Sequence, residues 1–412
     1  MERVVITGRG IISPLGNDVT TFWENLRAGQ SGITAIDTFD TSKLKCKIAG
    51  MVRNFDAEGR FGRKEARRMD RYCQYALAAA QQAVAEAGLR LEQINRERVA
   101  VYVGSGIGGI GTLMEQAKLL QERGADRVSP LLVPMMIANM AAATISIHYG
   151  ITGPTLAPVT ACSIGNTAIG EAARLIQTGA ADVVIAGGAE AAITEIALAS
   201  FGNATAISTR NEAPQLASRP FDGERDGFVL GEGAALLTLE SLSHALRRNA
   251  VIYGEVVGYG ASSDAYHMVA SHPEGEGAFL AMKAALADAG LHPGEIDVIS
   301  AHATSTDVGD RSETAAIKRL FGERARQIPV TANKSMLGHM LGAAGGAAAI
   351  ALLQSMEAGI IPPTINQQAA DPYCDLDYVP NEARQARISV GMANSFGFGG
   401  HNAALVLRSF NS

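Results

Sequence analysis

The stretch ALAAAQQAVAEAGLRLEQINRERVAVYVGS, residues 76–105, has a counterpart later in the chain, AFLAMKAALADAGLHPGEIDVISAHATS, residues 278–305. Each begins with an alanine-rich segment of helical periodicity that ends at AGL, and each continues through a loop into an apolar strand. Gly88 and Gly290 stand where a helix terminates. The stretch therefore predicts a helix–strand unit that the chain uses twice.

A second pair of similar segments follows in the same order. VTACSIGNTAIGEAARLIQTG begins at Val159, and VTANKSMLGHMLGAAGGAAAIALLQSMEAG begins at Val330. In both, we expect an apolar strand to end in a turn and a helix of small residues to begin just after it. Two collinear matches predict two related halves, residues 1–250 and 251–412, in a layered α/β fold. Matching turns of the two halves would meet at a site that takes Cys162 from one half and His302, Lys334 and His339 from the other.

Composition excludes several classes of protein. The 412 residues are 47% hydrophobic and 18% charged, too apolar for a disordered chain. The net charge of −6 argues against a nucleic-acid-binding surface over the whole molecule. The four cysteines include no C-x-x-C pair, which argues against a structural zinc site. The opening MERVVITGRG reads as a strand and not as a signal peptide, so we expect a cytoplasmic protein.

Two long segments carry no Asp, Glu, Lys or Arg. They run from residue 128 to 170 and from residue 335 to 356. Gly, Asn, His or Pro interrupt both, and a membrane-spanning helix needs about 20 predominantly apolar residues. We interpret them as protein interior or a subunit interface, where charge is depleted, and expect no membrane insertion.

Cys162 is the strongest candidate nucleophile. The sequence places it at the end of an apolar strand and the start of a helix, where the helix dipole would lower its pKa. The neighbouring backbone N–H groups would be natural oxyanion donors. A free cysteine is also often no more than a small buried residue. Cys46, Cys73 and Cys374 lack this context, and we interpret them as buried residues.

His302, His339 and Lys334 lie among small residues near the matching turns. A buried histidine can be a core residue without a role, but two histidines and a lysine at corresponding turns of a duplicated fold favour a site. A cysteine with imidazoles suggests acyl transfer through a thioester. Two imidazoles without a metal signature could also donate to a developing enolate oxygen, which decarboxylation of a malonyl group requires.

Two further motifs are less specific. GSGIGGIG, residues 104–111, contains G-x-G-x-x-G but lacks an acidic residue at the end of a second strand, so a dinucleotide loop is weakly supported. RFGRKEARRMDR, residues 60–71, places its basic side chains on one face of an expected helix. This face is either solvated or a docking surface for an acidic partner.

These motifs together resemble the β-ketoacyl-acyl carrier protein synthases of the condensing-enzyme family, closest to synthase II, over essentially the whole chain. The matching stretches are VTACSIG, AHATSTDVGD, NKSMLGH and NSFGFGGHN, with GSGIGG, RPFDGERDGFVLGEGA and IPPTIN. The resemblance implies a thiolase-like fold, duplicated as five layers α/β/α/β/α, and a homodimer. It implies decarboxylative condensation of acyl- and malonyl-loaded acyl carrier protein in fatty acid biosynthesis, without metal or nucleotide cofactor.

The resemblance also assigns roles. Cys162 would take the acyl chain, His302 and His339 would promote decarboxylation, and Lys334 would organise the site electrostatically. The N–H groups of Cys162 and Phe398 would form the oxyanion hole, with Phe398 as a gate. The implied contacts with substrate are Ile107 and Phe201 for the acyl chain, Thr304 and Thr306 for the pantetheine arm, and Gly397 and Gly399 in the gate loop. Lys64, Arg67 and Arg68 match the helix that docks the carrier protein.

Three residues depart from the family pattern. Ala303 stands where HGTST is usual, and Thr205 stands where an arginine often serves carrier docking. Ala348 stands where a glutamate commonly interacts with the site lysine. The departures leave room for a specialised lipid or polyketide pathway.

Several rival classes remain to be weighed. A degradative thiolase would need a cysteine in its C-terminal glycine-rich loop, and the GFGGHN loop has none. The initiating synthase III and the chalcone synthases use Cys-His-Asn, whereas this chain has His339 after Lys334. A non-catalytic partner subunit would lack the nucleophile, and a nicotinamide oxidoreductase would need the weak glycine motif.

Overall fold

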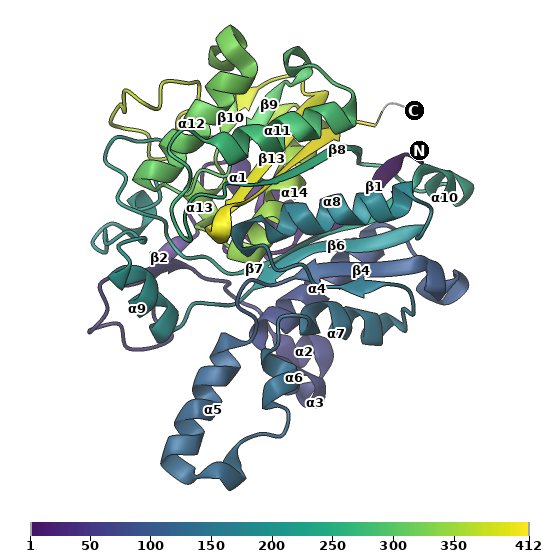
Figure 1. Ribbon diagram of the computed structural model, residues 1–412. Coiled ribbons are helices and arrows are strands. Elements are labelled where there is room, and N and C mark those ends of the chain that lie inside the picture. The colour runs from purple at the N-terminus through teal and green to yellow at the C-terminus, as the bar shows by residue number, and fades with distance from the viewer. Residues whose placement is uncertain (1, 411–412) are drawn as a thin grey trace.

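A ten-stranded mixed sheet runs through the computed structural model, which describes residues 2–410 (Figure 1). The strand order is β10–β9–β13–β14–β8–β1–β7–β6–β4–β5. Their bounds are β1 Val4–Ile12, β4 Val99–Gly104, β5 Thr155–Leu156, β6 Val183–Glu190, β7 Gly233–Ser241, β8 Gly254–Ser263, β9 Val298–Ser300, β10 Val330–Thr331, β13 Val390–Gly397 and β14 His401–Arg408. The five strands that precede residue 250 lie on one side of the β1–β8 pair, and the five that follow lie on the other.

The two sets of strands have the same pairing pattern. From β1 outward through β7, β6, β4 and β5, two antiparallel pairings are followed by two parallel ones. From β8 outward through β14, β13, β9 and β10, the pattern is identical. This order supports the division into residues 1–250 and 251–412, which stays a prediction.

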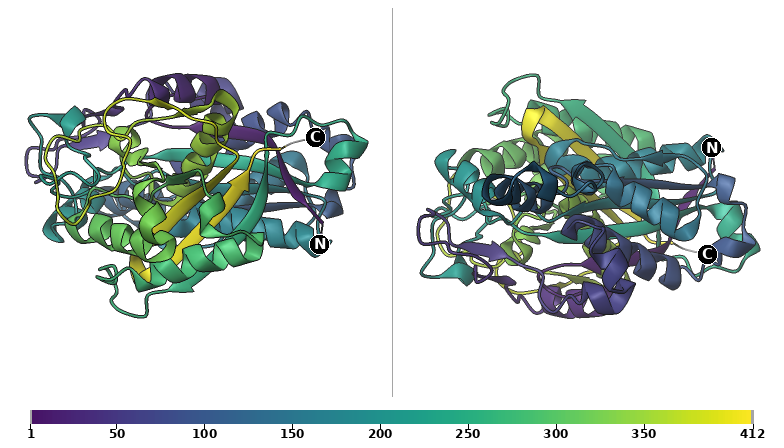
Figure 2. Two further views of the ribbon diagram at one scale, coloured as in Figure 1. Left: turned by 90° about the horizontal axis from the view of Figure 1, so that it is seen from above. Right: turned by 90° about the horizontal axis from the view of Figure 1, so that it is seen from below.

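Helices complete five layers (Figures 1 and 2). α8 (Ile164–Gln177) and α14 (Ala344–Ala358) form the middle layer and contact strands of both sets. α4 (Arg71–Glu86) and α7 (Met140–Tyr149) cover the outer face of the first set, and α11 (Glu276–Ala289) and α12 (Asp307–Phe321) cover that of the second. The predicted five-layer α/β/α/β/α fold is confirmed.

Both predicted helix–strand units are present. α4 leads to β4 and α11 leads to β9, and each helix ends at a left-handed glycine, Gly88 (φ 61°) or Gly290 (φ 65°). Glycine is required where these helices lie on the sheet, since a Cβ on Gly10 of β1 would stand 1.9 Å from the carbonyl oxygen of Ala79. A Cβ on Gly260 of β8 would stand 2.1 Å from that of Ala281. The same close approach is thus built twice.

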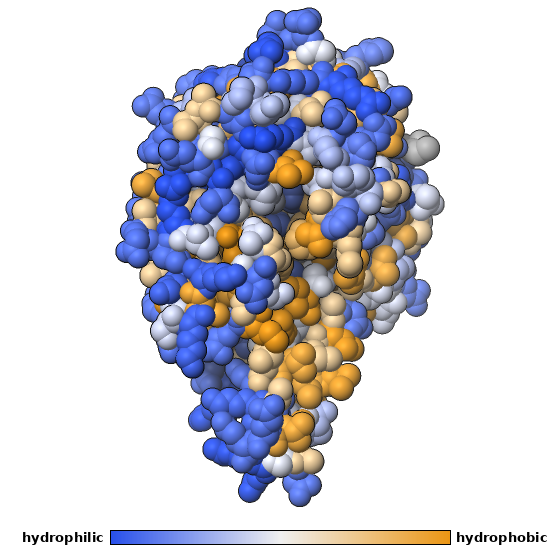
Figure 3. Space-filling view, turned by 60° about the vertical axis from the view of Figure 1, so that its left-hand side comes forward, coloured by the Kyte–Doolittle hydropathy of each residue, from blue (hydrophilic) through white to orange (hydrophobic). Residues whose placement is uncertain are grey.

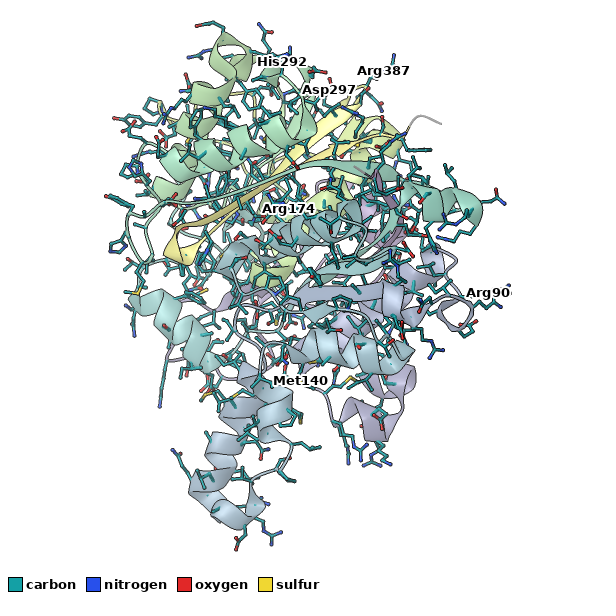
Figure 4. All side chains as sticks on the ribbon, turned by 45° about the vertical axis from the view of Figure 1, so that its right-hand side comes forward. Arg90, Met140, Arg174, His292, Asp297 and Arg387 are labelled. Carbon is teal, nitrogen blue, oxygen red and sulfur yellow. The ribbon has the colours of Figure 1, made fainter. Side chains whose placement is uncertain are left out.

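Three of the hydrophobic clusters follow these layers. One contains side chains of the middle helices and of both strand sets, including Ile169, Ile350, Val184 and Leu405. The other two lie between each strand set and its outer helices. Arg174 of α8, labelled in Figure 4, is exposed, and its guanidinium carbon stands 4.6 Å from the ring centroid of Tyr259 on β8. The first cluster, which contains side chains of both strand sets, shows that the halves share one interior.

Smaller elements surround this framework. The remaining helices are α1 Val19–Arg27, α2 Ala57–Phe61, α3 Arg63–Ala66, α5 Ile110–Arg123, α6 Leu132–Met136, α9 Glu195–Asn203, α10 Leu242–Arg247 and α13 Lys334–Leu337. Two short sheets pair β2 (Ile33–Ala35) with β3 (Ile48–Gly50) and β11 (Ile360–Ile361) with β12 (Arg384–Gln385). The single helix expected over residues 60–71 is wrong, because Gly62 adopts φ 77° and divides it into α2 and α3, and Arg71 opens α4.

The two charge-free segments have different environments. Residues 335–356 are almost entirely buried, which confirms an interior position. Residues 128–160 include exposed apolar side chains, among them Val133, Ile147 and Val159. In Figure 1, α5 and α6 project from the body as an arm, and Figure 3 shows apolar side chains gathered over this part of the surface. Among residues 2–410, none of the helices is both long and apolar enough to cross a membrane.

Candidate active site

Cys162 lies in a tight turn at the start of the middle layer. Ala161–Ser163 form a short 3-10 turn that leads into α8, and Ala161 adopts φ 50°. The thiol is 8% exposed and borders a cavity of about 460 Å³. The predicted apolar strand directly before Cys162 is wrong, because β5 is only two residues long and ends at Leu156, and Pro158 follows it.

The beginnings of α8 and α14 touch one another. A Cβ on Gly165 would stand 2.5 Å from the backbone nitrogen of Gly346, so only glycine fits here. Leu341 adopts φ 46° at the start of a 3-10 turn before α14, as Ala161 does before α8. Gly342 therefore corresponds to Cys162. The connection from β10 to Gly342 is five residues longer than the connection from β5 to Cys162, and this longer connection carries Lys334 and His339.

Two imidazoles lie together at this junction. His302 follows β9 and His339 follows α13, and their ring centroids are 5.5 Å apart with an interplanar angle of 86°. Within the described residues, Nδ1 of His302 and both ring nitrogens of His339 are buried without a hydrogen-bond partner. Burial lowers the pKa of both rings well below the usual value, and the charge of Lys334 lowers it further. Both are therefore neutral imidazoles at neutral pH, each with one N–H to donate.

Lys334 stands behind the histidines and does not border the cavity. Its Nζ donates to the backbone carbonyl oxygen of His302. Burial lowers the pKa of Lys334 to about 8, and the nearby Glu313 carboxylate limits that fall. Lys334 therefore contacts the loop that carries His302 and brings a charge close to the cavity without bordering it.

Two buried carboxylates of α12 hold the loop that carries His302. Glu313 accepts hydrogen bonds from the backbone N–H groups of His302 (2.9 Å) and Ala303 (2.8 Å), and Asp310 accepts one from Ser305 (3.1 Å). Burial raises the pKa of Asp310 to about 7. Ala303 adopts φ 35°, a left-handed conformation that favours glycine. The family pattern HGTST has a glycine at this position, so the alanine of this chain is a change that affects the backbone. Sequence reasoning missed both carboxylates, although their i, i+3 spacing in DVGDRSE places them on one helix face.

The expectation that the helix N-terminus lowers the pKa of Cys162 is wrong. Burial raises this pKa to about 12, although the charge of Lys334 acts in the opposite direction. The backbone N–H groups of Phe398 and of Cys162 itself are directed at the sulfur. These are the two groups expected to form the oxyanion hole.

The cavity brings most of the predicted contact residues together. It is bordered by Ile107, Phe201, Thr304, Thr306, Gly397 and Phe398, with Cys162, His302 and His339. Gly399 does not border it but turns the chain with φ 78°, and its N–H donates to the carbonyl oxygen of Met268 (2.8 Å). Phe398 is 38% exposed, and its ring centroid stands 6.5 Å from that of Phe201.

The glycine-rich loop is closed by a carboxylate. Buried Glu190 accepts from the N–H of Gly106 (2.8 Å), the N–H of Ile107 (3.1 Å) and the hydroxyl of Ser105 (2.8 Å). The N–H groups that would bind a phosphate in a dinucleotide loop are thus occupied. The structure gives this loop a different use, as one wall of the cavity.

The predicted docking residues lie away from the cavity wall. Lys64 is in α3, and Arg67 and Arg68 follow it directly, all three exposed. Arg67 lies 3.8 Å from Glu58 and Arg68 lies 3.4 Å from Glu65, so acidic neighbours partly neutralise them. Thr205 borders the cavity, and Ala348 borders a small void of about 10 Å³ beside Lys334.

Comparisons with known proteins agree with this architecture. The β-ketoacyl synthase N-terminal domain matches residues 1–245, and its C-terminal domain matches residues 253–368. The 3-oxoacyl-[acyl-carrier-protein] synthase 2 of Synechocystis is 48% identical over 99% of this chain and 98% of its own length. That of Staphylococcus aureus is 49% identical over 100% and 99%.

Solved structures show the same fold. A β-ketoacyl synthase from Burkholderia phymatum superposes with a TM-score of 0.92 at 36% identity, covering all of both chains. A type II polyketide ketosynthase in complex with its acyl carrier protein gives 0.92 at 34% identity, covering 99% of this chain and 100% of its own. The fold and site thus define a thiolase-like condensing enzyme. The chain belongs to the β-ketoacyl synthase family, whose members form carbon–carbon bonds.

Proposed function

We propose that the protein condenses an acyl group, held on Cys162, with a malonyl group, both delivered by acyl carrier protein, and so elongates fatty acids. The relatives that support this proposal are named 3-oxoacyl-[acyl-carrier-protein] synthase 2, a name that gives the product as a 3-oxoacyl group on acyl carrier protein. They are 48–49% identical to this chain. The type II polyketide ketosynthase is less similar, at 34%. Fatty acid elongation is therefore favoured over a polyketide pathway.

Acylation requires the thiol of Cys162 to lose its proton. Because burial holds its pKa near 12, the resting side chain is neutral, and a neighbouring neutral imidazole must accept the proton as the sulfur attacks. The acyl–sulfur bond forms on Cys162, and the carrier thiol leaves with a proton. The N–H groups of Cys162 and Phe398 stabilise the oxyanion of the tetrahedral intermediate.

Condensation then uses the malonyl thioester. Its carboxylate leaves as carbon dioxide, and the electron pair of the broken bond passes into a thioester enolate. His302 and His339, both neutral, donate to the enolate oxygen. The enolate carbon attacks the acyl carbonyl, a carbon–carbon bond forms, and the sulfur of Cys162 leaves as a thiolate that regains its proton. The product is a 3-oxoacyl thioester.

The observation that carries this proposal is the meeting of Cys162 and two unpartnered imidazoles in one cavity. A non-catalytic partner subunit would have no need of this arrangement. Cavities of about 300–1,000 Å³ are usual for small-molecule sites, and this one, about 460 Å³, lies within that range.

The test is intact-protein mass after incubation with long-chain acyl carrier protein. We expect a gain of one acyl group, absent from Cys162→Ala and present in Cys46→Ala. Cys46 is a matched control because it is a free buried thiol in the same hydrophobic cluster. Each single variant, His302→Asn or His339→Asn, leaves the other imidazole to accept the thiol proton and should therefore keep the acyl adduct, and each should lose release of carbon dioxide from malonyl carrier protein. No adduct with any chain length would contradict the proposal.

We further propose that two copies assemble through the arm and α7, and that the protein works in the cytoplasm. The arm and its surroundings expose Leu131, Val133, Ile137 and Ile147, and a surface patch of this kind marks an interaction site. Light scattering should give twice the chain mass, and Val133→Asp with Ile147→Asp should shift it to one chain mass.

A further inference from the structure

Lys45 lies beside the entrance of the cavity, on a segment that sequence reasoning did not single out. The carbonyl oxygen of Gly202, in the last turn of α9, accepts the backbone N–H of Thr205 at 3.2 Å. The same oxygen accepts the Nζ of Lys45 at 3.5 Å. The Lys45 ammonium group and Thr205, which borders the cavity, therefore share one acceptor atom.

The segment before β3 fixes the direction of the Lys45 side chain. Leu44, Cys46 and Ile48 turn inward, into the hydrophobic cluster that also contains Cys162. Lys45 and Lys47 alternate with them and are exposed. Lys45 also packs along α9, since the site of a Gly202 Cβ lies 3.6 Å from the Cβ of Lys45. The aliphatic part of the Lys45 side chain is thus held against α9, and its ammonium group lies at the edge of the cavity, beside Thr205.

Two neighbouring cations, Lys47 and Arg210, lie near acidic residues, whereas Lys45 does not among the described contacts. Lys47 lies near Asp40, whose pKa is lowered chiefly by hydrogen bonds from Ser42 and in part by Lys47. Arg210 lies 4.0 Å from Glu224. No carboxylate within the described residues forms an ion pair with Lys45.

We propose that Lys45 is a docking residue for the acidic surface of the carrier protein at the α9 side of the entrance. It supplies the positive charge that Thr205, with its short neutral side chain, does not. The inference rests on the proposed function, since it takes the partner to be an acidic carrier protein that must reach this entrance. It adds a contact on a different element from Lys64, Arg67 and Arg68.

The test compares Lys45→Glu and Lys45→Ala with the unchanged protein on two substrates, acyl carrier protein and a carrier-free acyl-pantetheine thioester. We expect the KM for acyl carrier protein to rise about three- to tenfold in Lys45→Glu and less in Lys45→Ala. The carrier-free reaction should not change. Because ion pairs at a rim are screened by salt, the difference should shrink at high ionic strength.

A rescue and a control complete the design. Thr205→Arg in the Lys45→Ala background should restore the KM for acyl carrier protein, because it returns a cation to the same rim. Lys283→Glu, an exposed lysine on the outer helix α11, is the matched control and should leave the KM unchanged.

Two results would overturn the inference. One is a KM for acyl carrier protein that is the same in Lys45→Glu as in the unchanged protein at every salt concentration. The other is an equal loss with both substrates, which would show that Lys45 only stabilises the end of α9. Failure of the proposed function is distinct, because the unchanged protein would then form no acyl adduct on Cys162.

Discussion

Replacement of Glu313 by glutamine tests whether the buried carboxylate holds the His302 loop in place. One oxygen, Oε1, accepts from the N–H of His302 at 2.9 Å and from Asn394 at 3.0 Å. The other, Oε2, accepts from the N–H of Ala303 at 2.8 Å. A glutamine can replace only one of these acceptors, because its amide nitrogen carries hydrogens.

The magnitude follows from these three bonds. If the amide oxygen takes the place of Oε1, two bonds remain, and the amide NH₂ group of the new side chain faces the N–H of Ala303. A lost charge-assisted bond costs about 1.5–3 kcal/mol, and an unsatisfied buried donor costs about 1–3 kcal/mol. Relief from burying a carboxylate offsets part of this cost. We expect Glu313→Gln to lower the free energy of unfolding by about 2–4 kcal/mol.

Catalysis should change in a defined direction. The Glu313 carboxylate raises the pKa of Lys334, which burial holds near 8. Without it, this pKa falls, and the ammonium group is lost at a lower pH. The alkaline limb of the pH profile for condensation should therefore move to lower pH in Glu313→Gln.

Urea unfolding, followed by the fluorescence of Trp23 in the central cluster, measures the stability change at a fixed protein concentration. Glu357→Gln is the control, since this carboxylate pairs with Arg9 but is 56% exposed, and we expect a change below about 1 kcal/mol. A change below about 0.5 kcal/mol in Glu313→Gln, a size usual for surface substitutions, with an unmoved pH profile would refute the reasoning.

Three other variants or reactions test separate features. Ala348→Glu, or the smaller Ala348→Asp, adds a carboxylate beside Lys334 and should move the alkaline limb to higher pH; an unmoved limb in a folded variant would contradict this. Alkylation of Cys162 by iodoacetamide should accelerate throughout pH 7–9, because its pKa is about 12, and a plateau near pH 8 would show a lower value. Gly165→Ala should destabilise the fold by about 1–3 kcal/mol in thermal unfolding, because its methyl group meets backbone atoms, whereas Gly294→Ala, in open space, should be near neutral.

The sequence predicts the framework because the framework depends on local patterns. Helical periodicity and a terminal glycine define α4 and α11, and the repetition of these units implies the duplicated layers. The residues that meet in the cavity follow from the same duplication, since His302 and His339 lie near corresponding turns. The resemblance to a known family adds their roles, which the proposed experiments test.

The remaining features depend on contacts between distant residues. Glu190 lies 84 positions from Gly106, and nothing local to the glycine loop shows that a carboxylate closes it. The pKa of Cys162 depends on how deeply the whole fold buries it, so the helix dipole alone gave the wrong direction. Gly62 divides the basic segment because it adopts φ 77° between α2 and α3, and a helical wheel does not indicate such a break at one glycine.

The ladder that joins the two strand sets is short. β1 and β8 share only three pairs within the described residues, Val4 with Val256, Val5 with Glu255 and Ile6 with Gly254. The side chains of α8 and α14, buried between the sets, supply most of the attachment. A separated half would leave one face of its middle helix uncovered in water. The duplicated molecule should therefore unfold as one cooperative unit, and cutting the chain near residue 250 should yield no folded fragment.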